Sequence, residues 1–242
     1  MTVLPPLPSA DPAIVPYLVV VPAGSFAMGE NDEDKFANDT ERPRHEVAIP
    51  RDFGMSVFPV TVGEFRAFRP GHAPRESADL PAVGISWLDA TGYCEWLGEQ
   101  TGRAFRLPTE AEWEYACRAG SRDIFTHGNT LDTDQANYLY SEHGMKVGRG
   151  HRTPCGVFPP NAFGLFDMHG NVCEWAQDTW HPDYLGAPND GSAWIEGGRR
   201  GWRVIRGGAW DYLPRLLRTS WRDALPEAIR RDNVGFRVAC DL

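Results

Sequence analysis

Short apolar runs, separated by turn-forming residues, set the pattern of this chain. Residues 17–22 form the first run and predict a strand, which a turn follows at residues 23–24. Residues 45–49 alternate between polar and apolar side chains, as expected of an edge strand. Near the C-terminus, residues 201–206 and 233–239 predict two further strands on either side of a loop rich in Trp and Arg. The strands are few and short.

Three helix starts are marked by capping boxes. In each, a Ser or Thr side chain can accept the N–H of a residue in the first helical turn, while an acid three residues later bonds back. The acid also favours the positive end of the helix dipole. The three pairs are Thr61 with Glu64, Ser86 with Asp89, and Thr109 with Glu112. We expect the third helix to close at Gly120.

No helical period survives in residues 121–200, where Gly, Pro, Asn and Asp recur every few residues. With 25 Gly and 20 Pro in 242 residues, the pattern favours a loop-rich single domain. So long an irregular segment is unusual in a compact domain and needs ions or dense polar networks to hold it. We expect a Pro-rich tail at residues 1–16 and a single domain at residues 17–242.

Composition and charge exclude several classes of protein. The formal net charge is −9, and Lys35 and Lys146 are the only lysines, so no basic stripe for nucleic acid is expected. No apolar run reaches the length of a membrane span, and the first residues lack the features of a signal peptide. We therefore expect a cytoplasmic protein, a monomer that binds neither nucleic acid nor membrane. Its five cysteines, an odd number without metal-finger spacing, are expected to be free thiols.

Three phrases carry a specific likeness to a known family. They are RLPTEAEWEYAC at residues 106–117, NAFGLFDMHGNVCEW at residues 161–175, and RVIRGGAW at residues 203–210, with GFRVA following at residues 235–239. In this order they resemble the formylglycine-generating enzyme family, also called sulfatase-modifying factor proteins. The resemblance spans about residues 17–239. It implies an α+β, C-type-lectin-like fold, loop-rich, with a small twisted antiparallel sheet and a few helices.

The resemblance also implies structural calcium. Asp167 and Glu174 lie seven residues apart around a Gly-Asn turn, an arrangement that can wrap oxygen ligands around a hard cation. The family's ligand positions fall here on Asp167, Gly170, Val172 and Glu174, the middle two through their carbonyls. The alternative is that the two carboxylates merely accept loop N–H groups.

A second family calcium site would use Asn137 and Tyr138. The loop that follows them is shorter here, and its acid does not align with the family's. The resemblance therefore implies this second site only in part.

The chain departs from the family's enzymes at their copper site. Those that make formylglycine hold Cu(I) between two cysteines five residues apart, because soft thiolates suit this soft metal. The corresponding positions are Tyr212 and Leu217, and Ala209 replaces the usual hydroxyl after the two glycines. Copper is therefore not expected, nor is standard formylglycine formation.

Cys173 stands where the family usually has tryptophan near the oxidation pocket. One interpretation is a relocated reactive thiol, which requires a lowered pKa and access to solvent. The other is a buried small side chain that fills part of the tryptophan's volume. The sequence favours the second.

The loop before the last strand mixes aromatic residues with arginines, as binding hot spots do. It could equally pack inside, with Arg218 or Arg222 paired to Asp211 or Asp223. We expect a concave pocket around Tyr212 and Leu217, walled by Trp210 and Trp221. The candidate ligand-binding residues are Trp210, Asp211, Tyr212, Arg215, Leu217, Trp221 and Arg222.

Two functions follow from the resemblance and the missing copper pair. The first is a calcium-stabilised module whose C-terminal loop binds a peptide, protein or small-molecule ligand, as in the variable proteins of diversity-generating retroelements. The alternative is a non-standard oxidoreductase of the same family that modifies a peptidyl or carrier-bound side chain, as the pyoverdine-maturation relatives are thought to do. No phosphate-binding loop, nucleophile elbow or zinc-protease motif offers another starting point.

Overall fold

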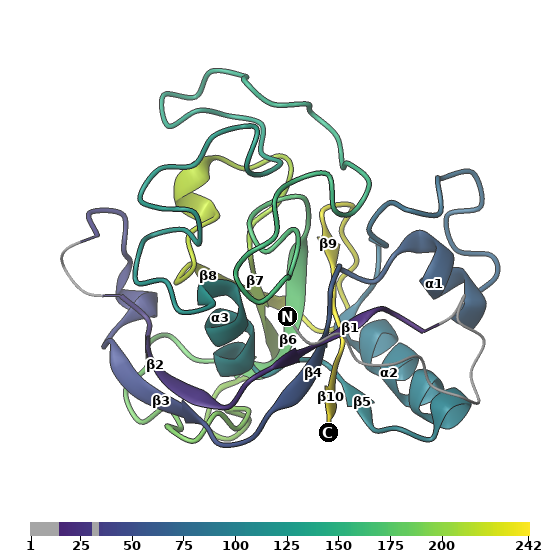
Figure 1. The fold of residues 1–242 in the computed structure, drawn as a ribbon, viewed down its shortest axis with the longest axis horizontal. Helices are drawn as coiled ribbons and strands as arrows, with labels where there is room; N and C mark the ends of the chain where they lie inside the picture. Colours follow the sequence, from purple (N-terminus) through teal and green to yellow (C-terminus); the bar gives the residue numbers. More distant parts are fainter. Residues whose placement is uncertain (1–14, 31–33) are drawn as a thin grey trace.

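Three helices flank two four-stranded sheets and a β-hairpin, with long loops gathered at one end (Figure 1). The computed structural model describes residues 15–30 and 34–242. The expected α+β, loop-rich architecture is confirmed. The Pro-rich tail expected at residues 1–16 lies outside the described residues, apart from its last two. No helix in the described ranges is both long and apolar enough to cross a membrane.

The first sheet brings the two ends of the described chain together. Its strands run in the order β1 (Leu18–Val21), β4 (Phe53–Ser56), β10 (Ala239–Asp241) and β5 (Phe105–Arg106), all antiparallel. Met55 lies opposite both Val19 and Ala239, so β4 is the strand that joins the N-terminal and C-terminal parts.

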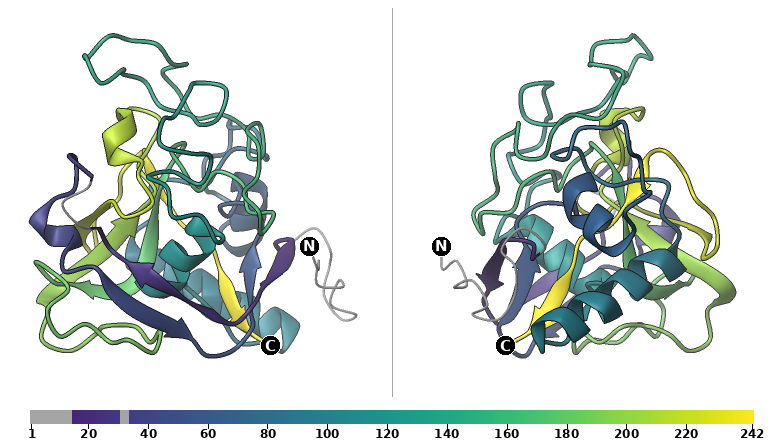
Figure 2. Two further views of the ribbon diagram at one scale, coloured as in Figure 1. Left: turned by 60° about the vertical axis from the view of Figure 1, so that its left-hand side comes forward. Right: turned by 90° about the vertical axis from the view of Figure 1, so that its right-hand side faces the viewer.

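The second sheet carries parts of the phrases described above, at residues 173–175, 203–206 and 235. Its order is β8 (Arg222–Pro226), β7 (Arg199–Arg206), β6 (Cys173–Trp180) and β9 (Val234–Gly235). Only the β6–β9 pairing is parallel. A separate hairpin, β2 (Gly24–Met28) with β3 (His45–Ile49), lies beside α3 (Glu110–Arg118) (Figure 2). Two 3₁₀ turns, η1 (Asp39–Glu41) and η2 (Pro214–Leu216), complete the elements.

All three capping boxes form as predicted. They open α1 (Val62–Phe68), α2 (Trp87–Thr101) and α3, whose first residues follow the capping side chains of Thr61, Ser86 and Thr109. Every residue of α3 is buried, so this short helix forms part of the core. It ends one residue earlier than expected, because Ala119 already adopts the left-handed conformation (φ 46°) before Gly120 does.

The sequence pattern did not predict five of the strands: β2, β4, β5, β6 and β8. Strand β6 lies inside the segment predicted to be irregular, and β8 lies inside the predicted loop. Both faces of β6 are mostly buried, so its residues show no alternation of polar and apolar side chains. The single strand predicted at residues 233–239 is instead divided between β9 and β10, which belong to different sheets.

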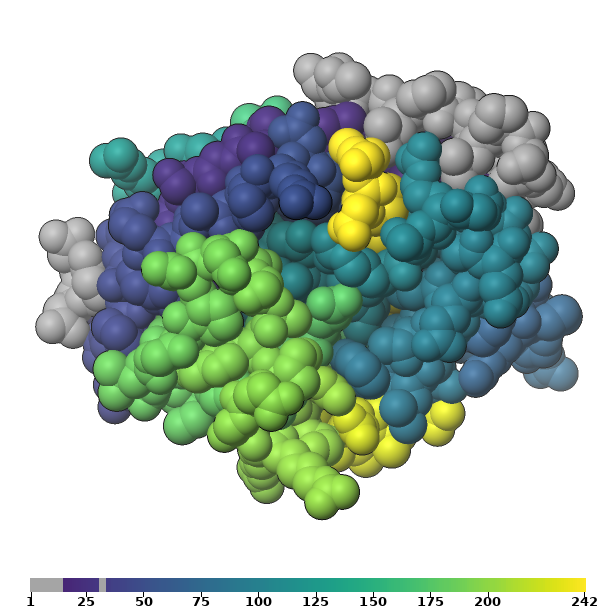
Figure 3. All heavy atoms as spheres, turned by 90° about the horizontal axis from the view of Figure 1, so that it is seen from below, coloured from purple at the N-terminus to yellow at the C-terminus, as the bar shows by residue number. Residues whose placement is uncertain are grey.

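The apolar core has two main parts, one on each side of the first sheet's central strands. Trp175, Tyr93 and Phe236 centre the larger part, and Trp113 with Met55 centres the other. Seen from below, residues 180–200 form a surface beside the hairpin and α2 (Figure 3). The loops of residues 121–172 lie at the opposite end, over the start of β6 (Figures 1 and 2).

Asp178 on β6 ties the start of α3 to the second sheet. Its carboxylate accepts the N–H of Glu110 at 2.7 Å and that of Trp194 at 2.7 Å. Burial, with the nearby charge of Glu110, raises the pKa of Asp178 to about 7. The folded protein therefore binds this proton more tightly than the unfolded chain, and stability falls as pH rises from about 4 through 7.

We predict that Asp178→Asn flattens this pH dependence. The slope contributed by one such group reaches about 1.4 kcal/mol per pH unit. Thermal unfolding of both proteins between pH 5 and 8.5 checks the prediction: the wild type loses stability across the range faster than the variant. Parallel curves for the two proteins would contradict it.

Candidate functional site

We define the C-terminal loop as residues 210–221. The turn that leads into it, at Gly207 and Gly208, accepts only glycine at both positions. Gly207 and Gly208 both have positive φ values, 89° and 73°. A Cβ on Gly208 would lie 2.5 Å from the Leu216 carbonyl oxygen, and one on Gly207 would lie 3.1 Å from the Trp113 ring. After β7 the chain therefore packs closely against Trp113 of α3. It then enters the loop through Ala209, which is fully buried.

The two positions that hold copper cysteines in the family's enzymes are closed by packing. Leu217 is fully buried in an apolar cluster with Phe125, Leu131 and Tyr138. Tyr212 is half-buried and packs edge-on against Trp221, with ring centroids 5.8 Å apart. The prediction of a concave pocket around Leu217 is therefore wrong, because an apolar side chain at this position completes the core instead of leaving an opening.

Cys173 lies beneath this part of the loop and is also fully buried. Tyr212 packs against the apolar cluster that contains Cys173, and burial raises the pKa values of both the thiol and the Tyr212 hydroxyl. A buried, protonated thiol is a poor nucleophile and a poor metal ligand. The structure therefore supports the interpretation of Cys173 as a small core residue and not as a reactive thiol. All five cysteines are free, as expected.

Two arginines, Arg218 of the loop and Arg222 just after it, point inward to partners far away in the sequence. Arg218 binds Glu41 through two contacts of 2.6 Å and Asp34 through one of 2.9 Å. Arg222, the first residue of β8, binds Glu110 on α3 at 2.7 and 2.8 Å. Arg222 is thus not available to a ligand, and neither arginine pairs with the nearby acids that the sequence suggested.

The remaining candidates are distributed between core and surface. Trp221 is buried, and both carboxylate oxygens of Asp211 accept from Asn233 Nδ2, at 3.0 and 3.2 Å. Arg215 is exposed and lies near Glu142, which accepts its backbone N–H at 2.6 Å. Trp210 is half-buried, and its indole N–H has no acceptor among the described residues. The side chains that can meet a ligand are therefore Trp210, Tyr212 and Arg215.

Glu174 does not fit the role of calcium ligand. Its Oε2 accepts the Trp113 indole N–H at 2.7 Å and the Arg237 Nε–H at 2.6 Å, and its Oε1 accepts Arg237 Nη2 at 2.8 Å. All three side chains are fully buried. The carboxylate's charge is already balanced by a guanidinium, so this part of the predicted ligand set is replaced by an ion pair.

Asp167 does fit a cation. It is buried in the left-handed conformation, and its Oδ2 accepts the Gly156 N–H at 2.8 Å. Its Oδ1 has no partner among the described residues. Burial raises the pKa of Asp167 to about 6. Gly170 and Val172 follow it in the same turn, where the Gly170 carbonyl accepts the Val172 N–H at 2.8 Å. Calcium at this turn remains a prediction based on Asp167 and not on Glu174.

Asn171 organises this region through its side-chain amide, a role that the sequence pattern did not predict. Its Oδ1 accepts hydrogen bonds from Asn137 Nδ2 at 3.1 Å and the Thr153 N–H at 3.0 Å, and its own N–H donates to the Asn137 carbonyl at 2.9 Å. Tyr138 donates its hydroxyl to Leu131 within an apolar cluster. Among the side-chain atoms of the second predicted calcium pair, Asn137 Oδ1 lacks a partner in the described chain.

No cluster of three or more His, Cys, Asp or Glu side chains suited to a metal occurs in residues 15–30 and 34–242. Besides Asn171, sequence reasoning missed Arg237 as the partner of Glu174. Arg237 could have been singled out from the sequence, because it lies inside the GFRVA phrase near the C-terminus. Nothing in the sequence showed which acid it would meet.

The fold and these motifs define a family. A model of the sulfatase-modifying factor enzyme 1-like domain matches residues 5–242, and the chain belongs to this family. The match begins within the segment expected to be a tail. The copper cysteines are therefore absent from a chain that the family model matches over residues 5–242.

Several relatives with different names share this domain. The chain is 29% identical to the inactive Cα-formylglycine-generating enzyme 2 of Mus musculus, covering 93% of this chain and 85% of that protein. It is 30% identical to the serine/threonine-protein kinase pkn1 of Chlamydia caviae over 92% of this chain, which spans only 37% of that relative's length. Among solved structures, PvdO from Pseudomonas aeruginosa is 35% identical, with a TM-score of 0.88 over 100% of this chain and 98% of that one. The Treponema denticola variable protein 1 shares the fold, with a TM-score of 0.79 at 21% identity over 93% of this chain and 94% of that one.

We predict that Glu174→Gln destabilises the protein equally with calcium and with a chelator. Removing one partner of a buried ion pair costs about 3–5 kcal/mol, because Arg237 is left uncompensated. Denaturant unfolding in both solutions, with the exposed Glu95→Gln on α2 as the matched control, checks this. A loss seen only in calcium would show that Glu174 acts as a metal ligand after all.

Proposed function

We propose that this protein is a ligand-binding member of its family that works without copper. The observation that carries the proposal is the filling of both copper positions by Tyr212 and Leu217, one half-buried and the other fully buried. Neither side chain supplies a thiolate, and a buried leucine leaves no room for a metal. The name of the mouse relative, an inactive enzyme, is consistent with a family in which the fold outlasts the oxidation chemistry.

The C-terminal loop is well suited to binding because it is held in one conformation. The Tyr212 carbonyl accepts the N–H groups of Leu139 and Tyr140 at 3.0 and 3.1 Å, and Arg218 anchors the loop to η1. A loop already ordered loses little conformational entropy when a ligand binds. Trp210, Tyr212 and Arg215 then offer two aromatic surfaces and one charge, a composition common at binding hot spots.

The oxidoreductase alternative gains nothing from Cys173. A thiol-based oxidation needs a thiolate that a substrate can reach. Here the thiol is fully buried with a raised pKa, and Tyr212 packs against the apolar cluster that contains it. Binding without redox chemistry is therefore the function that the geometry supports best. The expected ligand is a peptide, a protein segment or a small molecule.

We predict that the purified protein binds no stoichiometric Cu(I). An anaerobic competition titration against a chromophoric Cu(I) chelator measures this directly. The double variant Tyr212→Cys with Leu217→Cys serves as the control that restores the thiol pair at these positions. Tight one-to-one Cu(I) binding by the wild-type protein would overturn the proposal.

The same proposal predicts where a ligand binds. Peptides selected from a random display library on the immobilised protein should lose at least about tenfold in affinity on Trp210→Ala, since hot-spot aromatics contribute 2 kcal/mol or more. The control is Trp202→Ala, a half-buried tryptophan of β7 outside the loop. Equal losses for both variants, or for neither, would refute a binding role for the loop.

A further inference from the structure

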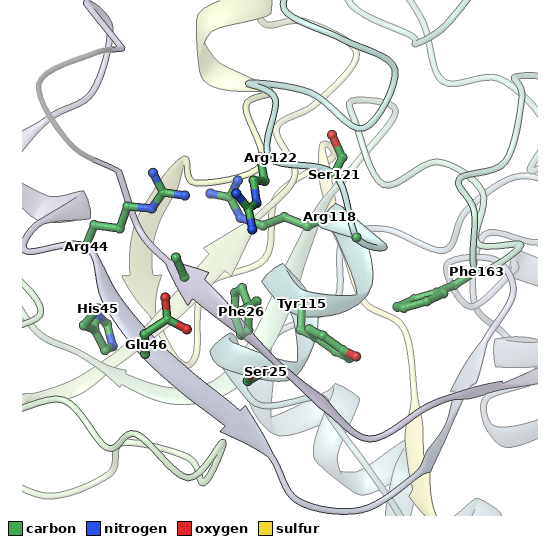
Figure 4. Close-up of a pocket in the computed structure, with 12 residues that line it drawn as sticks. Ser25, Phe26, Arg44, His45, Glu46, Tyr115, Arg118, Ser121, Arg122 and Phe163 are labelled. Atoms are coloured by element: carbon green, nitrogen blue, oxygen red, sulfur yellow. The ribbon is translucent and has the colours of Figure 1, made fainter.

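A cavity of about 810 Å³ lies between the β2–β3 hairpin and the C-terminal end of α3, away from the loop discussed above (Figure 4). Its volume is that of a pocket for a small organic molecule. One wall is aromatic, made by Phe26 of β2, Tyr115 of α3 and Phe163. The rings of Phe26 and Tyr115 lie 5.3 Å apart, and those of Tyr115 and Phe163 lie 5.7 Å apart.

Three arginines lie at the other side of this cavity. Figure 4 shows the guanidinium groups of Arg44, Arg118 and Arg122 pointing toward one another above Phe26. They come from three places in the chain: the residue before β3, the last residue of α3, and the turn after it. Like charges gathered in this way repel one another unless anions lie between them.

Arg118 is the buried member of the group. It is only 3% exposed, and it binds Glu114 at 2.8 Å and donates to the Gly29 carbonyl at 3.2 Å. Its Nη1 has no partner among the described residues. A buried donor without an acceptor costs free energy, and a ligand oxygen would remove that cost.

The acids around the cavity leave some of the arginines' donors without a hydrogen-bond partner in the described chain. Glu30 lies 3.8 Å from both Arg44 and Arg118, beyond hydrogen-bond distance. Glu114 is shared with Arg206 in the core, and Glu46 faces the cavity from β3. The Nε atom of Arg44 is buried and has no hydrogen-bond partner in the described chain. Arg122 is exposed and forms no ion pair with any described residue.

We propose that this cavity binds a small organic anion. Its carboxylate or phosphate group is held by Arg44, Arg118 and Arg122, and its apolar body packs on Phe26, Tyr115 and Phe163. Planar guanidinium groups match both oxyanions, because each can donate two parallel hydrogen bonds. The site shares no residue with the C-terminal loop, so it stands or falls independently of the function proposed above.

Calorimetric titration of the whole chain tests this site with defined probes. Benzoate and phenyl phosphate carry the two oxyanions on the same ring, and benzyl alcohol is the neutral analogue. At least one of the anions should bind at least about tenfold more tightly than benzyl alcohol, as expected for charge-assisted hydrogen bonds. The tighter of the two identifies the oxyanion that the site prefers.

Arg122→Gln provides the decisive variant, because this residue is exposed and its loss leaves the fold intact. Its binding of the preferred anion should weaken by about tenfold or more. Arg75→Gln, the same change at an exposed arginine outside the cavity, should leave binding unaltered. The proposal is overturned if neither anion binds more tightly than benzyl alcohol, or if the two variants behave alike.

Discussion

Buried pairs of arginine with carboxylate hold this loop-rich chain together. Arg206 binds Glu114 at 2.5 Å, Arg222 and Arg206 share Glu110, Arg218 binds Glu41, and Arg237 binds Glu174. Each of these arginines is at most 4% exposed. Charges so deeply buried are tolerated only when they are paired, so each pair fixes which segments must meet.

These pairs join parts of the chain that have little regular structure to connect them. Glu110 and Glu114 on α3 receive arginines from β7 and β8, and Glu41 reaches across 177 residues to Arg218. The loops thus have an anchor of the kind that a long irregular segment requires. The same pairs consume most of the positive charge near the C-terminal loop, which leaves Arg215 as its exposed cation. The ligand binding that we propose for the loop would therefore depend mainly on its two half-buried aromatic residues, Trp210 and Tyr212.

The sequence predicted what depends on local chemistry. Capping boxes at Thr61, Ser86 and Thr109 are local, and all three helices begin where expected. Strand β6 could not be predicted from its pattern, since burial on both faces removes alternation.

The long-range partners of charged residues could not be predicted either. Arg218 and Arg222 were expected to meet acids close to them in the loop, and instead meet acids on η1 and α3. The same limit applies to Glu174, whose spacing suited a calcium ligand until Arg237 was placed beside it. The cavity's arginines come from separate elements and form no motif, so only the fold brings them together.

Buried ion pairs, and not local sequence, position the C-terminal loop, and a double-mutant cycle on Arg218→Met and Glu41→Gln, measured by denaturant unfolding, is the direct test. Each single variant should be strongly destabilised, and the two effects should couple by about 1–3 kcal/mol, because either change alone leaves the other group unpaired in the core. Additive effects, with no coupling between the two residues, would contradict it.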